Sequence, residues 1–585
     1  MFFHPFGSLG SEFDASSYRC FQILLAMCGF VLAASSAFGQ CGPPQYLCVR
    51  TDTSVIPVPS PLPFGGPSGA NTIFYDSAFN SDHAPQYVRV TDAKTANNAS
   101  MLASHAGDDK LWNADDTFFF TKSIGAAVYV FSLNQSTMST NLVWAPNGSV
   151  WDSAAWSQSN RNYLYAFERN NSTGNPTGKL IRWNFSACGA GACTPASAIA
   201  FDFAANCGVN PEPFADGAPW SQVTMLGVSG SAASPDTVFG AYFGPQDLGN
   251  QVVVFNGRSC FFYNTQYGTI YNYSGSPTVL SGTATCTKGS TIVSGRFDVV
   301  GSWAGLNIVV GRRSGYQVAA SSRTSLTLRS NYTGKTGRCS YSLKPGMYIG
   351  TVTGPDRYYS HGGRLDPSGT WAVIPTNTCL SGTCQTNHMW QVGTATVSIA
   401  LDRAGHAGGH PAETAYGWIN MDANYTAWSA VSMLYRSWAN IGATSIPPIV
   451  ELSSITAAAD VGLDTHCSTR NDPEGIHHFP VFCMTWAMND PSASKFPYSM
   501  EIDAWSQNNP PNPIWRFGHT FNSNANAPGY NADLNGGVVS STGKYYLFTS
   551  DGLGTLGNIN GARTCSLLAG TCRTDVFILN LVPAQ

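Results

Sequence analysis

Apolar strands that begin at a small polar turn recur along this chain. A turn of Asp, Ser, Asn, Gly or Thr leads straight into an aromatic, β-rich run in residues 115–120, 159–167, 234–243, 366–374 and 541–550. Aromatic and β-branched residues favour strands, whereas the small polar residues favour turns. A turn-and-strand unit repeated at intervals of tens of residues is typical of β-propeller blades. The pattern therefore predicts an all-β chain built as a β-propeller.

The spacing of these units predicts seven blades, give or take one. We place them near residues 101–150, 151–205, 215–265, 355–405, 407–455, 464–517 and 519–585. Residues 276–348 break the rhythm with shorter strands and predict a small inserted β-barrel-like module. Propeller loops are exposed and tolerate such insertions. The propeller would then comprise residues 86–275, with the closing strand and three blades, and residues 349–585, with four.

The two ends of the predicted propeller each carry a strand without an obvious neighbour. Residues 86–93 form one good strand, and residues 574–581 form another. Because a ring of sheets must hide its open edge, we expect these strands to pair and complete the last blade. Residues 40–85, which are rich in Pro, Gly and Ser towards their start, predict a loosely held leader.

Composition and charge narrow the compartment and the partners. The chain has 585 residues, of which 11% are charged, and a formal net charge of −4, so nothing favours nucleic-acid binding. Arg19 precedes an apolar run in residues 21–32, and small residues follow up to Gly39. This predicts a signal peptide over residues 1–39 and a secreted, periplasmic or cell-surface protein, which we expect to be a monomer. No stretch is long enough to span a membrane.

The cysteines agree with export. Sixteen are present, and two of them fall in the predicted signal peptide, which leaves an even number. Close spacing suits disulfides across turns in an oxidising compartment, whereas zinc would need paired CxxC motifs that are absent. Cys286 and Cys339 lie near the ends of the inserted module and are positioned to clamp it. The predicted disulfide cysteines are Cys41 with Cys48, Cys188 with Cys193, Cys379 with Cys384, Cys565 with Cys572, and Cys286 with Cys339.

Four histidines fall near the starts of predicted blades: His361, His410, His466 and His519. The innermost strand of a blade begins beside the central channel, so imidazoles there would converge and suit a divalent metal ion. The alternative is structural, with each histidine tying a loop to a neighbouring blade by hydrogen bonds. Tryptophans such as Trp418 leave a similar choice between stacking on sugar rings and packing in the blade cores.

Part of this pattern resembles a known family. His361 ahead of Asp366-Pro-Ser-Gly369, and His519 ahead of residues 541–551, resemble the seven-bladed propellers that include oligogalacturonate lyases and TolB-like repeats. The C-terminal phrase is also similar to secreted bacterial propellers, and residues 276–348 resemble a small β module of phage tail and bacterial surface proteins. The lyase resemblance implies a manganese ion held by histidines on the propeller axis, and β-elimination on oligogalacturonides. It implies His361, His410, His466 and His519 as metal ligands.

Two classes of function follow. We favour a non-catalytic binding or surface protein that uses the channel mouth and the inserted module to hold a glycan or protein partner. The alternative is a carbohydrate-active enzyme of polysaccharide-lyase type, in which the channel histidines bind a divalent cation, manganese or calcium. A uronate substrate would also need positive charge and a stacking surface. Candidates for substrate binding are Arg364, Arg516 and Trp418.

Overall fold

The computed structural model describes most of the chain between Tyr46 and Val582. The signal peptide predicted over residues 1–39 lies outside the described residues. Within the described span, the residues left out are 47, 61, 63, 65–67, 104–109, 125–126, 147–153, 170–175, 209–221, 232–233, 245–250, 274–279, 312, 344–345, 353–356, 359–363, 378–385, 401–411, 414–416, 424–430, 441–447, 452–462, 472–479, 488–499, 506–513, 524–536 and 567–569.

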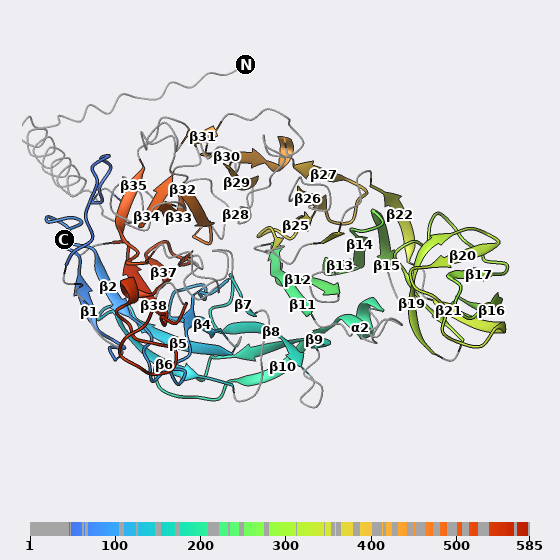
Figure 1. Ribbon diagram of the computed structural model, residues 1–585, viewed down its shortest axis with the longest axis horizontal. Coiled ribbons are helices and arrows are strands. Elements are labelled where there is room, and N and C mark those ends of the chain that lie inside the picture. The colour runs from blue at the N-terminus through green and yellow to red at the C-terminus, as the bar shows by residue number, and fades with distance from the viewer. Residues whose placement is uncertain are drawn as a thin grey trace, which may run out of the picture.

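The described residues fold into eight β-sheets, of which seven are open and one is a closed barrel. The seven open sheets follow one another around a ring, and the barrel projects from one end of it (Figure 1). Each open sheet is an antiparallel ladder of four to six strands, and its chain-order neighbours lie beside it. The prediction of a seven-bladed propeller with an inserted barrel-like module is confirmed.

The first three blades come from the N-terminal half of the chain. Blade 1 contains β3 (Met101–Leu102), β4 (Phe118–Ser123), β5 (Val128–Asn134) and β6 (Ser139–Trp144). Blade 2 contains β7 (Ala154–Trp156), β8 (Tyr163–Arg169), β9 (Pro176–Asn184) and β10 (Ala196–Asp202), followed by the short helix α2 (Phe203–Cys207). Blade 3 contains β11 (Gln222–Ser231), β12 (Ser234–Gly244), β13 (Gln251–Phe255), β14 (Cys260–Asn264), β15 (Thr269–Tyr273) and β22 (Met347–Thr351).

The remaining blades follow the inserted barrel. Blade 4 contains β23 (Arg357–Tyr358), β24 (Arg364–Leu365), β25 (Trp371–Asn377), β26 (Thr386–Gln391) and β27 (Val397–Ala400). Blade 5 contains β28 (Ala412–Glu413), β29 (Gly417–Ala423), β30 (Val431–Ser437) and β31 (Pro448–Glu451), with the 3-10 turn η2 (Trp438–Asn440). Blade 6 contains β32 (Leu463–Ser468), β33 (Val481–Ala487), β34 (Glu501–Trp505) and β35 (Trp515–His519).

Blade 7 closes the ring with strands from both ends of the chain. Its C-terminal strands are β36 (Val538–Val539), β37 (Tyr545–Ser550) and β38 (Asp575–Asn580), with the 3-10 turn η3 (Gly552–Gly554) between the last two. The strand β2 (Gln86–Arg89) pairs antiparallel with β38, and β1 (Ile73–Tyr75) adds outside it. The predicted pairing of the two terminal strands is confirmed. The described residues contain no helix long and apolar enough to cross a membrane.

A buried charge cluster fastens the closing strand. Arg89 on β2 donates from Nε to Asp575 on β38 at 3.0 Å, and Arg573 donates to the same carboxylate at 2.9 Å. Thr91 donates to the other carboxylate oxygen. All these side chains are buried, so each charge depends on its partner for the solvation it has lost. The cluster therefore fixes where β2 docks as well as how strongly.

The leader is packed against blades 6 and 7, contrary to the expectation that it is loosely held. Tyr46, Phe64 and Phe74 are buried in one apolar cluster with side chains of those two blades. Tyr46 also donates its hydroxyl to the Gly543 carbonyl at 2.6 Å. The aromatic residues between the prolines and glycines supply enough burial to hold the segment in place.

The recurring polar turns join the first and second strands of blades, and they bond to one another across blades. Asp116, in the blade 1 turn, accepts from Ser540 Oγ at 2.7 Å and from the backbone and hydroxyl of Thr542 in the blade 7 turn. Asp236, in the blade 3 turn, accepts from Tyr165 of blade 2 at 3.1 Å. Both aspartates have a left-handed φ, 59° and 54°, which Asp tolerates better than most residues. The repeated phrase therefore stabilises contacts between blades.

Stability should carry a pH signature from the turn aspartate. Burial raises the pKa of Asp116 to about 6, although its hydrogen bonds oppose the shift. The folded state then binds a proton that the unfolded state releases, so this contribution is fully present below pH 4 and is lost as pH rises through 6. Relative to wild type, Asp116→Asn should remove a slope of up to about 1.4 kcal/mol per pH unit between pH 4 and 6. Urea unfolding at several pH values measures it; parallel curves for the two proteins would contradict the shift.

Loss of the buried cation at the ring closure should destabilise the fold strongly. Arg89→Met leaves Asp575 buried with one partner fewer, and we expect a loss of about 3–5 kcal/mol in the free energy of unfolding. Arg161→Met is the matched control, because Arg161 is mostly exposed and pairs with Asp115 at 2.9 Å on the surface. We expect that control to lose less than about 1 kcal/mol. Equal losses in urea denaturation would show that the closure does not depend on this pair.

Candidate binding surface

The inserted module is a closed six-stranded barrel with its own hydrophobic interior. Its strands pair in the order β16, β17, β20, β19, β18, β21, and β21 pairs back to β16. Alternation along each strand puts residues such as Ile308, Val318 and Leu326 inside. The bounds are β16 (Leu280–Cys286), β17 (Ile292–Ser294), β18 (Asn307–Val310), β19 (Arg313–Ser321), β20 (Ser325–Leu328) and β21 (Gly337–Leu343).

The barrel is docked firmly on blade 3. One loop of the barrel, residues 302–305, offers backbone carbonyls to side chains of the propeller. The Ala304 carbonyl accepts from Thr269 and Tyr271, each at 2.7 Å, and the Gly305 carbonyl accepts from Gln251 and Asn264 at 3.2 and 3.3 Å. The barrel interior is also continuous with the apolar cluster between blades 2 and 3. The module therefore has a fixed orientation relative to the ring.

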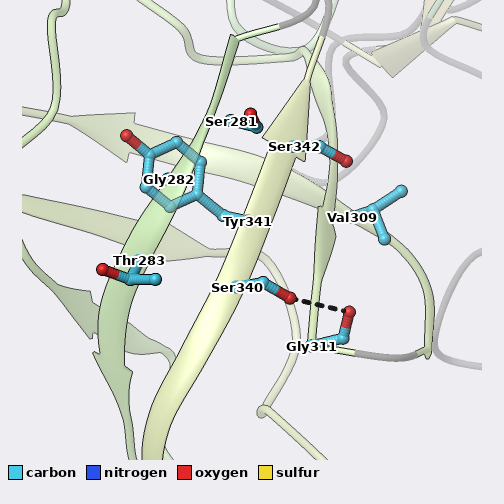
Figure 2. Close-up of a pocket in the computed structure, with 8 residues that line it drawn as sticks. All are labelled: Ser281, Gly282, Thr283, Val309, Gly311, Ser340, Tyr341 and Ser342. Atoms are coloured by element: carbon cyan, nitrogen blue, oxygen red, sulfur yellow. Dashed lines mark hydrogen bonds between the residues drawn. The ribbon is translucent and has the colours of Figure 1, made fainter.

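A shallow hollow of about 360 Å³ lies on the outside of this barrel, across the adjacent strands β16, β21 and β18 (Figure 2). Strand alternation turns Ser281 and Thr283 of β16 outward, with Ser340 and Ser342 of β21 beside them. Within the hollow, Ser340 donates to the Gly311 carbonyl at 3.4 Å. The complete lining is Ser281, Gly282, Thr283, Val309, Gly311, Ser340, Tyr341 and Ser342.

The side chains in this hollow are neutral, and most of them are hydroxyls. No Lys, Arg, His, Asp or Glu is among the lining residues. The nearest recorded cation contact is that of Arg338, which donates to Thr283 Oγ1 at 3.2 Å. A hydroxyl group both donates and accepts hydrogen bonds, so the hollow matches a ligand that also does both. Nothing in the sequence marked these serines, because alternating Ser and Thr are ordinary on an exposed strand face.

Of the four histidines predicted to converge on the channel, the structure describes the side chain of one. His519 is buried in β35, where Nδ1 lies 2.7 Å from Asp76 and Nε2 lies 3.0 Å from the Ile56 carbonyl. Both ring nitrogens are therefore engaged with the leader, which corresponds to the structural alternative. His361 and His410 lie outside the described residues, and only the backbone of His466, in β32, is described. Within the described part of the chain, no three His, Cys, Asp or Glu side chains gather as a metal site.

The predicted substrate-binding residues are not brought together on an accessible surface. Arg516 is buried in β35 and makes a two-pronged ion pair with Glu501, at 2.8 and 2.6 Å. Its remaining amino group donates to the carbonyls of Asp52 and Ser54 in the leader, so it also has a structural role. Arg364 is buried in β24. Trp418 lies in β29, and its side chain is outside the described residues.

A buried pair between blades 3 and 4 resembles a catalytic arrangement without being accessible. The Tyr263 hydroxyl lies 2.6 Å from His388 Nδ1, and both side chains are buried. Burial lowers the pKa of His388 to about 4, so the ring is neutral near pH 7. The pair joins β14 to β26 and contributes to the contact between blades.

The predicted disulfides fall into three groups. Cys188–Cys193, Cys286–Cys339 and Cys565–Cys572 are bonded, and the second of these joins β16 to β21 in the barrel. Cys48 is also disulfide-bonded, whereas Cys41, Cys379 and Cys384 lie outside the described residues. Two bonds escaped the sequence reasoning. Cys467–Cys483 links facing positions of β32 and β33, and Cys207–Cys260 joins α2 to β14 over a separation of 53 residues.

Comparisons with known proteins reach the architecture alone. No protein-family model and no curated protein matches this sequence. Among solved structures, the β-propeller domain of the trilobed protease from Pyrococcus furiosus covers 78% of this chain and 99% of its own, with 8% identity and a TM-score of 0.32. The oligogalacturonate lyase from Vibrio parahaemolyticus covers 87% and 96%, with 10% identity and a TM-score of 0.32.

A third similar structure is the β-propeller domain of Cps50 (Swd1) from Myceliophteria thermophila. It covers 81% of this chain and 96% of its own, with 8% identity and a TM-score of 0.31. All three neighbours are propellers, as the sequence resemblance predicted. Superpositions this loose say nothing about chemistry, and the fold assignment rests on the sheet order of the chain itself.

The docking of the barrel can be tested at one glycine. Gly305 has φ +86°, and a Cβ there would lie 2.7 Å from side-chain atoms of Asn264, so Gly305→Ala should disturb the loop on blade 3. Gly289 is the matched control, with φ +82° and nothing within 4 Å of an added Cβ. Backbone strain is thus similar in the two variants, and only Gly305→Ala should speed amide exchange across residues 302–306, by about tenfold or more. Equal exchange in both variants would contradict the docking.

Proposed function

We propose that the protein is an exported, non-catalytic binding protein and that the inserted barrel is its partner-contacting element. The observation that carries this proposal is the docking of the barrel on blade 3. Four propeller side chains, Gln251, Asn264, Thr269 and Tyr271, are committed to the carbonyls of one barrel loop. A rigid mount loses less conformational entropy on binding than a flexible tether, so it favours presentation of a surface to a partner.

The position of the barrel supports the same role. It enters and leaves through β15 and β22, which pair with each other, so the insertion leaves the blade ladder continuous. The barrel projects beyond the ring, and β16 lies at its end remote from the propeller (Figure 1). A surface held out in this way is accessible to a large partner such as a cell-wall polymer.

Export is supported by the cysteine chemistry. Five disulfides join described cysteines: those at Cys188, Cys207, Cys286, Cys467 and Cys565 with their partners. Disulfides persist mainly in oxidising compartments. Together with the apolar N-terminal run, they favour the extracellular space, the periplasm or the cell surface as the site of action.

Deletion of the barrel tests the proposal. Residues 280–343 are replaced by a short Gly-Ser linker, because β15 and β22 already pair and can form a hairpin; Cys286 and Cys339 leave together. Labelled full-length protein and the deletion variant are sedimented with particles of plant cell wall, fungal cell wall and bacterial peptidoglycan. We expect full-length protein to bind at least one of them, and the variant to bind at least about tenfold more weakly.

The alternative function has its own readout in the same experiment. Oligogalacturonides are incubated with the full-length protein and manganese, and the unsaturated product of β-elimination is followed by ultraviolet absorbance. We expect no product. Accumulation of that product, or sedimentation of the deletion variant equal to that of the full-length protein, would overturn the proposal. Thermal unfolding of the variant in one cooperative transition confirms that the propeller survives the deletion.

A further inference from the structure

We infer that the hollow across β16, β21 and β18 binds a neutral glycan, which gives the proposed binding function a ligand class and rests on it. The hollow combines a concave shape of about 360 Å³ with outward hydroxyls from two neighbouring strands. That volume lies at the lower end of the range of about 300–1,000 Å³ typical of small-ligand sites. It suits one or two sugar rings at the end or along the side of a chain.

The hydrogen-bonding groups favour a sugar. Ser281, Thr283, Ser340 and Ser342 each present a hydroxyl that donates and accepts, and sugar hydroxyls need partners of both kinds. Ser281, Thr283 and Ser340 are exposed, so their water-bonded hydroxyls can exchange solvent for ligand without breaking the barrel. Val309 and Tyr341 complete the lining and add apolar surface for the C–H faces of a ring.

The same features disfavour other ligands. The lining holds no charged side chain, so it offers no counter-ion to a phosphate, a uronate or an acidic peptide. Strand β21 pairs with β16 on one side and β18 on the other, so its backbone is used within the barrel. An extended peptide therefore has no free strand edge to join at the hollow. A neutral, hydroxyl-rich molecule is the class that fits both constraints.

Substitutions that fill the hollow or strip its hydroxyls test the inference. Ser342→Arg places a long side chain in the hollow, and Ser340→Ala with Ser342→Ala removes two hydroxyls without adding bulk. The control is Ser294→Arg, an exposed serine on β17 that does not line the hollow. Binding of soluble cello-, xylo-, malto- and chito-oligosaccharides to the full chain is measured by isothermal titration calorimetry.

We expect at least one of these neutral oligosaccharides to bind. Ser342→Arg should weaken its binding by about tenfold or more, the double alanine variant by about fivefold, and Ser294→Arg should bind as wild type. Wild-type affinity in Ser342→Arg, or no binding of any neutral oligosaccharide, would overturn the inference. The barrel deletion separates the two levels: if it abolishes sedimentation while Ser342→Arg does not, only the glycan site is wrong, whereas if it changes nothing, the proposed function is wrong.

Discussion

Closure of the ring is the constraint on which the rest of this structure depends. Seven sheets arranged in a circle leave the last blade incomplete unless the two ends of the chain meet, and here β2 and β38 provide that meeting. The pairing brings Arg89 to Asp575 in a dry environment, where each charge requires the other. The leader then packs over blades 6 and 7, so the first described residues stabilise the last blades of the propeller.

A closed ring limits where a new element can be added. The barrel is inserted between two strands that pair with each other, and the propeller therefore keeps its ladder while gaining a module. The side chains that hold the barrel donate to backbone carbonyls, which depends on the path of one loop more than on its side chains. This arrangement separates the two roles: the ring supplies a rigid base, and the outer face of the barrel is left to vary for binding.

The sequence predicted the architecture well because strands and turns leave local signals. The polar turns before aromatic strands located the blades, and the strand at residues 86–93 indicated the closure with β38. The leader was misjudged because proline and glycine suggested looseness, whereas Tyr46 and Phe64 are buried anchors. Long-range chemistry left no such signal: Cys207 and Cys260 are far apart in the sequence, and the partners of His519 come from the leader.

Site prediction was weaker for a related physical reason. Histidine and arginine drew attention as chemically versatile residues, yet in a nearly charge-free propeller the buried copies join segments of the fold, as Arg516 does with Glu501. The hollow instead uses serine and threonine, whose positions follow from strand alternation and barrel closure. Only the three-dimensional arrangement of β16, β21 and β18 sets them side by side (Figure 2).

Amide exchange of the full chain, compared with and without a sedimenting cell-wall polysaccharide, tests the central claim most directly. If the barrel contacts the partner, slowed exchange should concentrate in β16, β21 and the residues around Gly311, and the blades should change little. Slowed exchange confined to the propeller, with the barrel unaffected, would contradict the account.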